Sequence, residues 1–435
     1  MAAELWCRMA SASTVNSVRW GLEVSWIASR KMFAGVRVGI GFSDEGGDGV
    51  ALNPASPNFD NLNRILDLLI SAKLKCQLGI GGDGPPNIPA WHTLAGTVGD
   101  WPYNKRPPIG TANALVNAAA DIKNQAIELM VGRYRAAGLD PFEYCKVEIW
   151  NEPARGGAGA PAETESYWPA LPTLPIGTWD SFSNDPGASG AYDTINDYLN
   201  VEVPQLDFQC LKVIAPGFTA KMIDQSTNGL YEELETFDVD ATAWMDAVAA
   251  TVEPSWGLNC YYSLEDANIA LGAALYAERA VWGRDLRLEG SEDKNCIAYR
   301  INQIRDEIVA PECSKTRITI CEAGINPVLL GMVDDPDLVQ RQLNYYELGR
   351  ARLAYLDALR QLDVESVILY TASDTDSAAL GDQYGAFNEN LGTTGDVTYS
   401  AEIPFAQRAA RSSLVPFSGT DYILADEEIL PPRLT

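Results

Sequence analysis

The sequence of 435 residues contains a single histidine, His92, and this scarcity excludes several kinds of enzyme. A Ser-His-Asp relay can be formed only where His92 lies. A metal site of several histidines cannot be formed at all. No run approaches the ~18 consecutive apolar residues of a membrane-spanning helix. The start of the chain lacks a basic flank followed by an apolar run, so no secretory signal is visible. We therefore leave the location open: cytoplasmic by sequence, or extracellular if another route exports the protein.

Positive charge is also scarce, with 32 Lys and Arg residues against 59 Asp and Glu residues and a net charge of −27. Such a surface repels nucleic acid and anionic lipid, so we expect no nucleic-acid partner and no membrane partner. The eight cysteines show no Cys-x-x-Cys pair and no zinc-finger spacing. We expect neither a metal nor another cofactor, and the sequence leaves the oligomeric state unknown.

Short runs rich in β-branched residues alternate with helical patterns, which are clearest at residues 59–69, 115–130 and 337–362. Eight strands separated by helices predict an α/β fold, a (β/α)8 TIM barrel, because eight parallel strands close such a barrel. An open doubly wound sheet is the alternative, but the dinucleotide-binding fingerprint is missing. The predicted strands are Ser17–Ser25, Gly35–Phe42, Leu74–Ile80, Lys146–Trp150, Leu211–Pro216, Gly257–Tyr261, Arg317–Glu322 and Ser366–Thr371.

We expect a single catalytic barrel domain over residues 1–413 and an acidic, proline-containing tail over residues 414–435. Long βα loops rich in Gly, Pro, Ala and Ser follow three strands, at residues 81–110, 153–191 and 219–239. In such barrels the loops after the strands form the active-site face. The length of these loops therefore suggests a deep or roofed cleft.

Aromatic residues are frequent on these loops, and Trp91 and Trp168 are candidates to stack on the apolar faces of sugar rings. The alternative is that these rings pack the loops against the barrel. His92 lies beside Trp91, and we expect it to be solvated rather than to bind sugar.

Two strands end in a glutamate. The segment Val147 to Pro153 reads Val-Glu-Ile-Trp-Asn-Glu-Pro, and its proline stops ladder pairing where the chain leaves the sheet. The segment Ile318 to Gly324 reads Ile-Thr-Ile-Cys-Glu-Ala-Gly. Glu322 is the last residue of the seventh predicted strand, and Glu152 lies just after the fourth, so we expect both carboxylates at the same rim of the barrel.

Two facing carboxylates are the groups that cleavage of a glycosidic bond requires. One attacks the anomeric carbon, while the other protonates the leaving oxygen and later deprotonates water. A separation of about 5–5.5 Å leads to retention of the anomeric configuration. We interpret Glu152 and Glu322 as this pair rather than as salt-bridged or solvated rim residues.

The segment Trp150 to Pro153 resembles the acid/base motif of the retaining glycoside hydrolases of clan A. The finer resemblance is to glycoside hydrolase family 39, the family of β-xylosidases and α-L-iduronidases. Residues 36–45 are similar to its second-strand segment, and residues 59–78 to the helix and third strand that follow. Residues 369–374, with 384–387 after them, are similar to its eighth-strand segment.

This resemblance implies that Glu152 is the general acid/base and Glu322 the nucleophile. It implies that Asn151 holds the sugar hydroxyl next to the anomeric carbon, a contact that strengthens as charge develops.

The resemblance also implies that Arg37 orients the nucleophile and keeps it ionised. The alternative for Arg37 is an ion pair inside the barrel with Glu148. Tyr261 matches a tyrosine that hydrogen-bonds the nucleophile, and the alternative for this strand residue is core packing.

The chain departs from the family pattern at three positions. It has Gly39 and Asn259 where the family has histidine, and Tyr370 where the clan usually has a tryptophan beneath the sugar. In the family these positions line the first sugar subsite, so the resemblance does not imply the usual xylose or iduronate contacts for this chain, and Tyr370 is a candidate for substrate binding.

We therefore expect a retaining O-glycosyl hydrolase similar to β-xylosidases, acting on an oligosaccharide or polysaccharide through a covalent glycosyl-enzyme. The negative surface favours neutral glycans. One alternative is a transglycosylase that uses the same intermediate. The other is a non-catalytic carbohydrate-binding or structural protein on a barrel scaffold.

Overall fold

A computed structural model gives the fold of this chain. The predicted tail at 414–435 lies outside the described residues, as do most of the three long loops. The residues that the structure describes are 3–9, 17–42, 51–52, 57–81, 112–149, 203–214, 218–221, 254–262, 317–325, 337–360, 362–374, 385–388 and 399–412.

Eight parallel strands pair in a closed ring. In chain order each strand pairs with the next, and the last two neighbours, β10–β11 and β11–β1, return the ring to its start. Closure without an open edge defines the (β/α)8 barrel that the sequence predicts. The strands are β1 (Glu4–Arg8), β2 (Gly35–Gly39), β5 (Lys75–Gly79), β6 (Cys145–Glu148), β7 (Lys212–Ile214), β9 (Pro254–Tyr262), β10 (Arg317–Ile325) and β11 (Ser366–Leu369).

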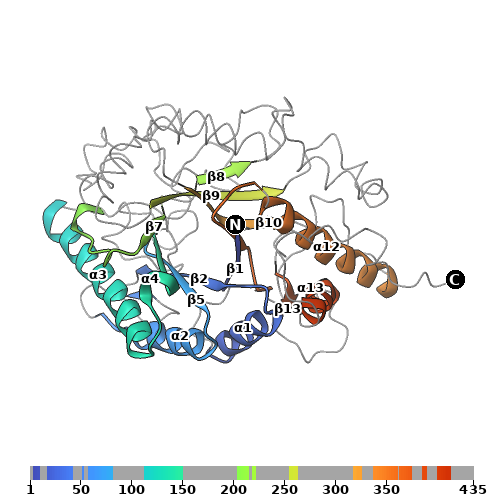
Figure 1. Cartoon of the computed structure of the whole chain (residues 1–435), viewed down its shortest axis with the longest axis horizontal. Coiled ribbons are helices and arrows are strands. Elements are labelled where there is room, and N and C mark those ends of the chain that lie inside the picture. The colour runs from blue at the N-terminus through green and yellow to red at the C-terminus, as the bar shows by residue number, and fades with distance from the viewer. Residues whose placement is uncertain are drawn as a thin grey trace, which may run out of the picture.

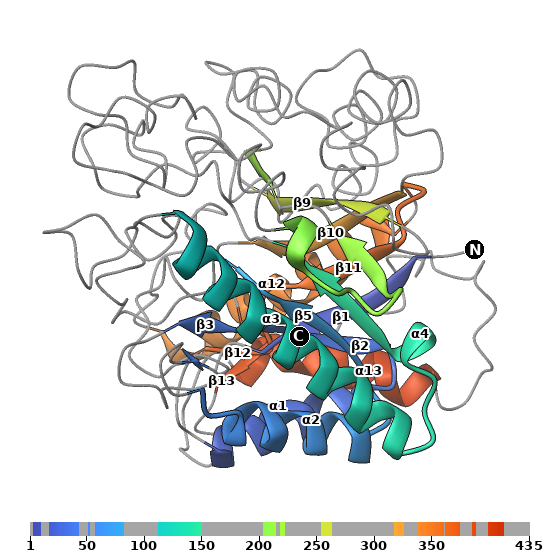
Figure 2. The same ribbon diagram turned by 90° about the vertical axis from the view of Figure 1, so that its left-hand side faces the viewer.

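Helices surround this ring. Figure 1 shows α1, α2 and α3 on one side of the strands and α12 and α13 on another, and Figure 2 shows α1 and α2 lying next to each other. The helices are α1 (Ser17–Arg30), α2 (Asp60–Ser71), α3 (Ala112–Ala136), α4 (Pro141–Tyr144), η4 (Val203–Gln205), α12 (Leu338–Leu359) and α13 (Tyr399–Ser412). The remaining short strands are β3 (Gly41–Phe42), β4 (Ala51–Leu52), β8 (Phe218–Lys221), β12 (Ser373–Asp374) and β13 (Phe387–Asn388).

The helix predicted from Asp337 onward is confirmed, and the aspartate explains where it begins. Its Oδ1 accepts hydrogen bonds from the backbone N–H groups of Val339 at 2.8 Å and Gln340 at 3.1 Å. These bonds satisfy two of the amide donors that the first turn of a helix leaves without intrahelical partners. The helices predicted around residues 59–69 and 115–130 are confirmed as α2 and α3.

The side chains of the strands divide between two environments. Outward-facing residues such as Val36, Leu78 and Val147 are fully buried in one hydrophobic cluster with the helices. Many inward-facing residues are polar, whereas branched aliphatic side chains commonly fill such barrels. The buried inward-facing polar residues are Arg37, Gln77, Lys146, Glu148, Ser255, Asn259, Thr319, Glu322 and Ser366.

The first predicted strand is wrong, because Ser17–Ser25 forms part of helix α1. Apolar and polar residues alternate along this segment, and that period of two predicted a strand. In the structure Trp20, Val24 and Ile27 face the core at helical spacing, while Val18 is 73% exposed. The other seven predicted strands are confirmed, with differences of a few residues at their ends.

The first strand of the barrel is instead β1. Its inward positions are Glu4, Trp6 and Arg8, so only Leu5 and Cys7 remain as outward apolar residues within the strand. A strand of five residues with charged ends carries little hydrophobic pattern, which is why sequence reasoning missed it.

None of the described helices has a stretch long and apolar enough to cross a lipid bilayer.

Candidate active site

Glu322 lies toward the carboxyl end of β10 at a β-bulge. Ile320 pairs with Leu258 of β9, and the next pair joins Glu322 to Asn259, which leaves Cys321 as an extra residue. Side chains alternate along a regular strand, but a bulge re-aims the residue that follows it. Cys321 and Glu322 are successive in sequence and both face the interior.

Arg37 of β2 joins two carboxylates in the barrel interior. Its Nε and Nη2 donate to Oε2 and Oε1 of Glu148 at 2.5 and 2.9 Å, and its Nη1 donates to Oε1 of Glu322 at 2.7 Å. Gln77 Nε2 donates to Oε2 of Glu148 at 3.0 Å. Arg37 and Glu148 are fully buried, so the two-bond arrangement fixes the direction of the guanidinium toward Glu322.

A second arginine contacts the same oxygen of Glu322. Arg8, at the end of β1, donates from Nη1 to Glu322 Oε1. Its guanidinium lies over the ring of Tyr370, 4.8 Å from the ring centroid, in a cation–π contact. The side chain of Arg8 is 20% exposed, whereas that of Glu322 is 2% exposed. Arg8 therefore lies closer to solvent than the carboxylate it contacts.

The pKa of the Cys321 thiol reflects the burial and the charges around it in the barrel interior. Burial raises its pKa well above the ordinary value, and the carboxylates of Glu148 and Glu322 raise it further, against the opposing effect of Arg37. A thiol of this kind stays protonated at neutral pH and does not act as a nucleophile. The other side chain at this bulge is the carboxyl group of Glu322, which contacts Arg8 and Arg37.

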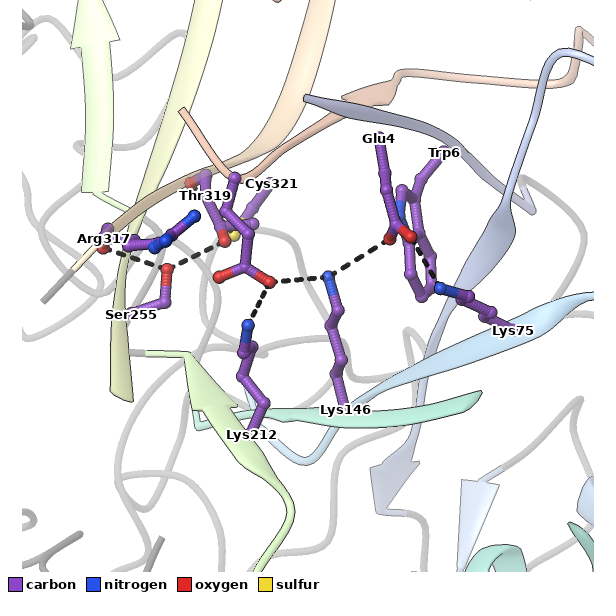
Figure 3. A network of polar contacts seen from close by, with 10 residues as sticks. Glu4, Trp6, Lys75, Lys146, Lys212, Ser255, Arg317, Thr319 and Cys321 are labelled. Atoms are coloured by element: carbon purple, nitrogen blue, oxygen red, sulfur yellow. Dashed lines mark hydrogen bonds and ion pairs between the residues drawn. The ribbon is translucent and has the colours of Figure 1, made fainter. Parts of the chain in front are cut away.

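A separate group of charges occupies the amino-terminal end of the barrel. Lys146 Nζ lies 3.0 Å from Oε1 of Glu365, just before β11, and 4.6 Å from the centroid of the Trp6 ring. Lys212 contacts the same oxygen of Glu365 at 2.5 Å, and Lys75 contacts Glu4 at 2.6 Å. Figure 3 shows Lys146 between Lys212 and Glu4, with Lys75 on the far side of Glu4.

The two groups of charges lie toward different ends of the barrel strands. The amino-terminal face of a TIM barrel contributes to stability, and the face at the carboxyl ends of the strands holds the active site. Arg8 and Glu148 are the last residues of β1 and β6, Glu322 lies in the second half of β10, and Arg37, the register partner of Arg8, is the middle residue of β2. The described part of the chain holds no group of three or more His, Cys, Asp or Glu side chains suited to a metal ion.

The structure brings together three of the predicted site residues. Arg37 contacts Glu322, as the resemblance implied, and it also forms the ion pair with Glu148 that was the alternative. Tyr370 follows β11, and its backbone N–H donates to the carbonyl oxygen of Ala323, the residue after Glu322, at 2.9 Å.

The other predicted site residues are not placed with their side chains. Tyr261 belongs to β9, where its backbone pairs with Gly324, but its side chain lies outside the described residues. Glu152, Asn151, Trp91 and Trp168 also lie outside them, as does His92. The chain is described as far as Ile149, the residue after β6, so the position of Glu152 stays a prediction.

Arg8 is the site residue that sequence reasoning missed. The signal that could have found it is the alternation in Ala3 to Met9, where apolar residues 3, 5, 7 and 9 enclose Glu4, Trp6 and Arg8. Recognising this segment as the first strand places Arg8 at a carboxyl end, beside Arg37 in the neighbouring strand.

Comparison with known proteins gives matches to solved structures alone. No family model matches the sequence, and no curated protein matches it significantly. The endo-1,4-β-mannanase from Rhizomucor miehei is 11% identical, with 94% of this chain and 95% of that chain covered and a TM-score of 0.49. An intracellular xylanase from Thermoanaerobacterium saccharolyticum is 12% identical, with 92% and 95% covered and a TM-score of 0.48.

A family 5 xyloglucanase from Paenibacillus pabuli is 11% identical, with 94% of this chain and 98% of that chain covered and a TM-score of 0.47. Identity and TM-scores this low identify neither a reaction nor a substrate for this chain. Its assignment as a (β/α)8 barrel rests on the closed ring of strand pairings.

Proposed function

We propose that this chain is a retaining glycoside hydrolase in which Glu322 is the nucleophile and Glu152 the general acid/base. The observation that carries the proposal is the buried carboxylate of Glu322, held at a bulge near the carboxyl end of β10 by Arg8 and Arg37. Active sites of such barrels lie at this end, and a carboxylate held between fixed donors is oriented for attack.

The proposed reaction has two steps. A carboxylate oxygen of Glu322 attacks the anomeric carbon, the bond to the leaving oxygen breaks, and Glu152 gives its proton to that oxygen. Water then gives a proton to Glu152 and attacks the anomeric carbon, and Glu322 leaves as a carboxylate. Asn151 is proposed to hold the neighbouring sugar hydroxyl, and Arg37 to orient Glu322.

The proposed substrates are neutral oligosaccharides or polysaccharides, because the net charge of −27 disfavours polyanionic ones. The Asn-Glu-Pro motif supports placement in clan A, and the finer proposal is a β-xylosidase-like enzyme similar to family 39. The chain departs from the pattern of that family at Gly39, Asn259 and Tyr370. We therefore propose β-xylosides as the first substrates to test and do not assume that they are the natural substrates. Tyr370, Tyr261, Trp91 and Trp168 are the proposed sugar-binding aromatic residues.

A screen of aryl glycosides tests the proposal, with xyloside, glucoside, galactoside, arabinoside and fucoside as substrates. The wild type, Glu322→Gln and Glu152→Gln are assayed together, and Glu128→Gln, an exposed change on α3, is the control. We expect Glu322→Gln to lose turnover. We expect azide to restore turnover to Glu152→Gln on activated aryl glycosides, because azide attacks the glycosyl-enzyme without a general base.

The outcomes separate the proposal from its alternatives. A product that carries a second sugar when acceptor sugars are added would identify a transglycosylase. Glycan binding without turnover by the wild type, unchanged in Glu322→Gln, would contradict the enzyme proposal and favour a binding protein.

A further inference from the structure

Two arginines from neighbouring strands contact one oxygen of Glu322, but their surroundings differ. Arg8 and Arg37 are register partners on β1 and β2, and both donate to Oε1 of Glu322. Arg37 is fully buried and is held by two hydrogen bonds to Glu148. Arg8 is 20% exposed and is the more accessible of the two cations on this carboxylate.

Backbone contacts fix Arg8 on the side of the barrel that carries Tyr370. The carbonyl oxygen of Arg8 accepts from the N–H of Ala372 at 3.0 Å, so β1 is tied to the segment that follows β11. The N–H of Tyr370 donates to Ala323, next to Glu322. Arg8 and Glu322 thus belong to β1 and β10, and Tyr370 directly follows β11, the strand between them in the ring. The Arg8 guanidinium lies on the Tyr370 ring.

From this geometry we infer that Arg8 is a positioning residue that stabilises the Glu322 carboxylate as it leaves the glycosyl-enzyme. The inference rests on the proposed function. In that second step water attacks the anomeric carbon, its proton goes to Glu152, and the bond from carbon to the Glu322 oxygen breaks. The electron pair of that bond returns to Glu322, and negative charge develops at the carboxylate that both guanidiniums contact.

Arg8 has opposite effects on the two steps. In the first step Glu322 loses negative charge as it attacks, so a cation beside it stabilises the starting state. In the second step Glu322 gains negative charge, so the same cation stabilises the transition state. Removal of Arg8 is therefore expected to slow the second step more than the first and to let the glycosyl-enzyme accumulate.

Steady-state kinetics of Arg8→Gln on an activated aryl glycoside test the inference. When breakdown of the intermediate limits turnover, we expect kcat to fall on the order of 100-fold, the effect of removing one such donor. We expect KM to fall with it, so that kcat/KM changes by less than about tenfold. Mass spectrometry of the quenched variant is expected to show protein carrying one glycosyl group, and Arg8→Lys, which keeps the charge, is expected to recover part of kcat.

The matched control is Arg133→Gln, which removes an arginine that pairs with Asp67 on the helical surface. It is expected to keep the wild-type kcat and KM. Wild-type kinetics in Arg8→Gln would overturn the inference. The inference would also be overturned if kcat/KM fell by the same factor as kcat and no glycosyl-enzyme accumulated.

A thermal double-mutant cycle provides a readout that does not depend on turnover. Arg8→Gln is expected to lower Tm in the wild-type background and to lower it less in the Glu322→Gln background, because the ion pair is already absent there. Equal shifts in both backgrounds would overturn the Arg8–Glu322 pairing. A wild type without any glycoside turnover would instead contradict the proposed function, and with it the role in the second step, even if the pairing stands.

Discussion

The interaction between Arg37 and Glu148 shows how single residues determine the geometry of the candidate site. A buried guanidinium with one carboxylate partner can rotate, but two hydrogen bonds to the same carboxylate hold its plane. Glu148 provides both bonds, and Gln77 in turn donates to Glu148. The direction in which Arg37 presents Nη1 to Glu322 thus depends on its two hydrogen bonds to Glu148.

We expect Glu148→Gln to lower the free energy of unfolding by about 3–5 kcal/mol, because it removes one partner of a buried ion pair. Turnover is expected to fall as well, since Arg37 loses its fixed direction. Urea denaturation measures the first effect and an aryl glycoside assay the second. Glu128→Gln, on the exposed face of α3, serves as the control and is expected to change stability by less than about 0.5 kcal/mol. A Glu148→Gln variant as stable as this control would contradict the account of Arg37.

At the scale of the elements, β1 and α1 show what a hydrophobic pattern can and cannot reveal. Seven barrel strands were predicted because their outward-facing residues are apolar and pack against the helices. The strand β1 was missed because its alternate positions, Glu4 and Arg8, take part in ion pairs inside the barrel. Helix α1 was mistaken for a strand because its apolar residues happen to alternate. Ion pairs across the barrel interior depend on which strands lie side by side in the fold. The hydrophobic pattern of one segment does not contain this information.

The close approach of β1 and β2 gives a test at this scale. A Cβ added to Gly35 would lie 2.5 Å from the Trp6 ring and 2.7 Å from the backbone oxygen of Lys75. We expect Gly35→Ala to lower the free energy of unfolding by about 1–3 kcal/mol. In Gly132→Ala, on α3, the added Cβ meets nothing within 4 Å, and this change is expected to raise stability by about 0.5–1 kcal/mol. Chemical denaturation of both variants measures the difference, and equal stabilities would contradict this packing of β1 against β2.

At the scale of the whole molecule, the barrel closes around two sets of charges at its two ends. The set at the amino-terminal end joins β1, β5, β6, β7 and the residue before β11. Burial alone would raise the pKa of Glu365, but the charges of Lys146 and Lys212 outweigh it and hold the pKa below the ordinary value. The pKa of Glu4 is lowered in the same way, with Lys146 and Lys75 outweighing burial.

These lowered pKa values predict how stability depends on pH. A carboxyl group whose pKa is lower in the folded state contributes stability above its unfolded pKa, and this contribution is lost as pH falls through the folded pKa. We expect Glu365→Gln to be less stable than the wild type at pH 7, and the two to converge between about pH 5 and pH 3. Urea denaturation across this range measures the effect. Glu143→Gln, exposed on α4, is expected to follow the wild type, and a constant offset between Glu365→Gln and the wild type would contradict the account.

Much of the candidate site follows from the sequence, and the remainder depends on packing. Glu322 was predicted because a strand ending in glutamate is visible locally, and its contact with Arg37 followed from the resemblance. The bulge at Cys321 could not be predicted, because it depends on the register between strands that are distant in sequence. Arg8 was missed because the first strand was assigned to Ser17–Ser25 instead of Glu4–Arg8. The roles of Glu152 and Asn151 stay predictions, since those residues lie beyond the described end of the fourth barrel strand.

Trapping of the proposed covalent bond between Glu322 and the sugar is the most direct test of the proposed mechanism. The wild type is incubated with the 2-deoxy-2-fluoro derivative of the glycoside that it turns over, because the fluorine slows breakdown of the intermediate. Digestion and mass spectrometry then locate the sugar. We expect one sugar per chain, attached at Glu322, and no label in Glu322→Gln. A sugar on any other residue, or release of a product with inverted anomeric configuration, would contradict the proposed mechanism.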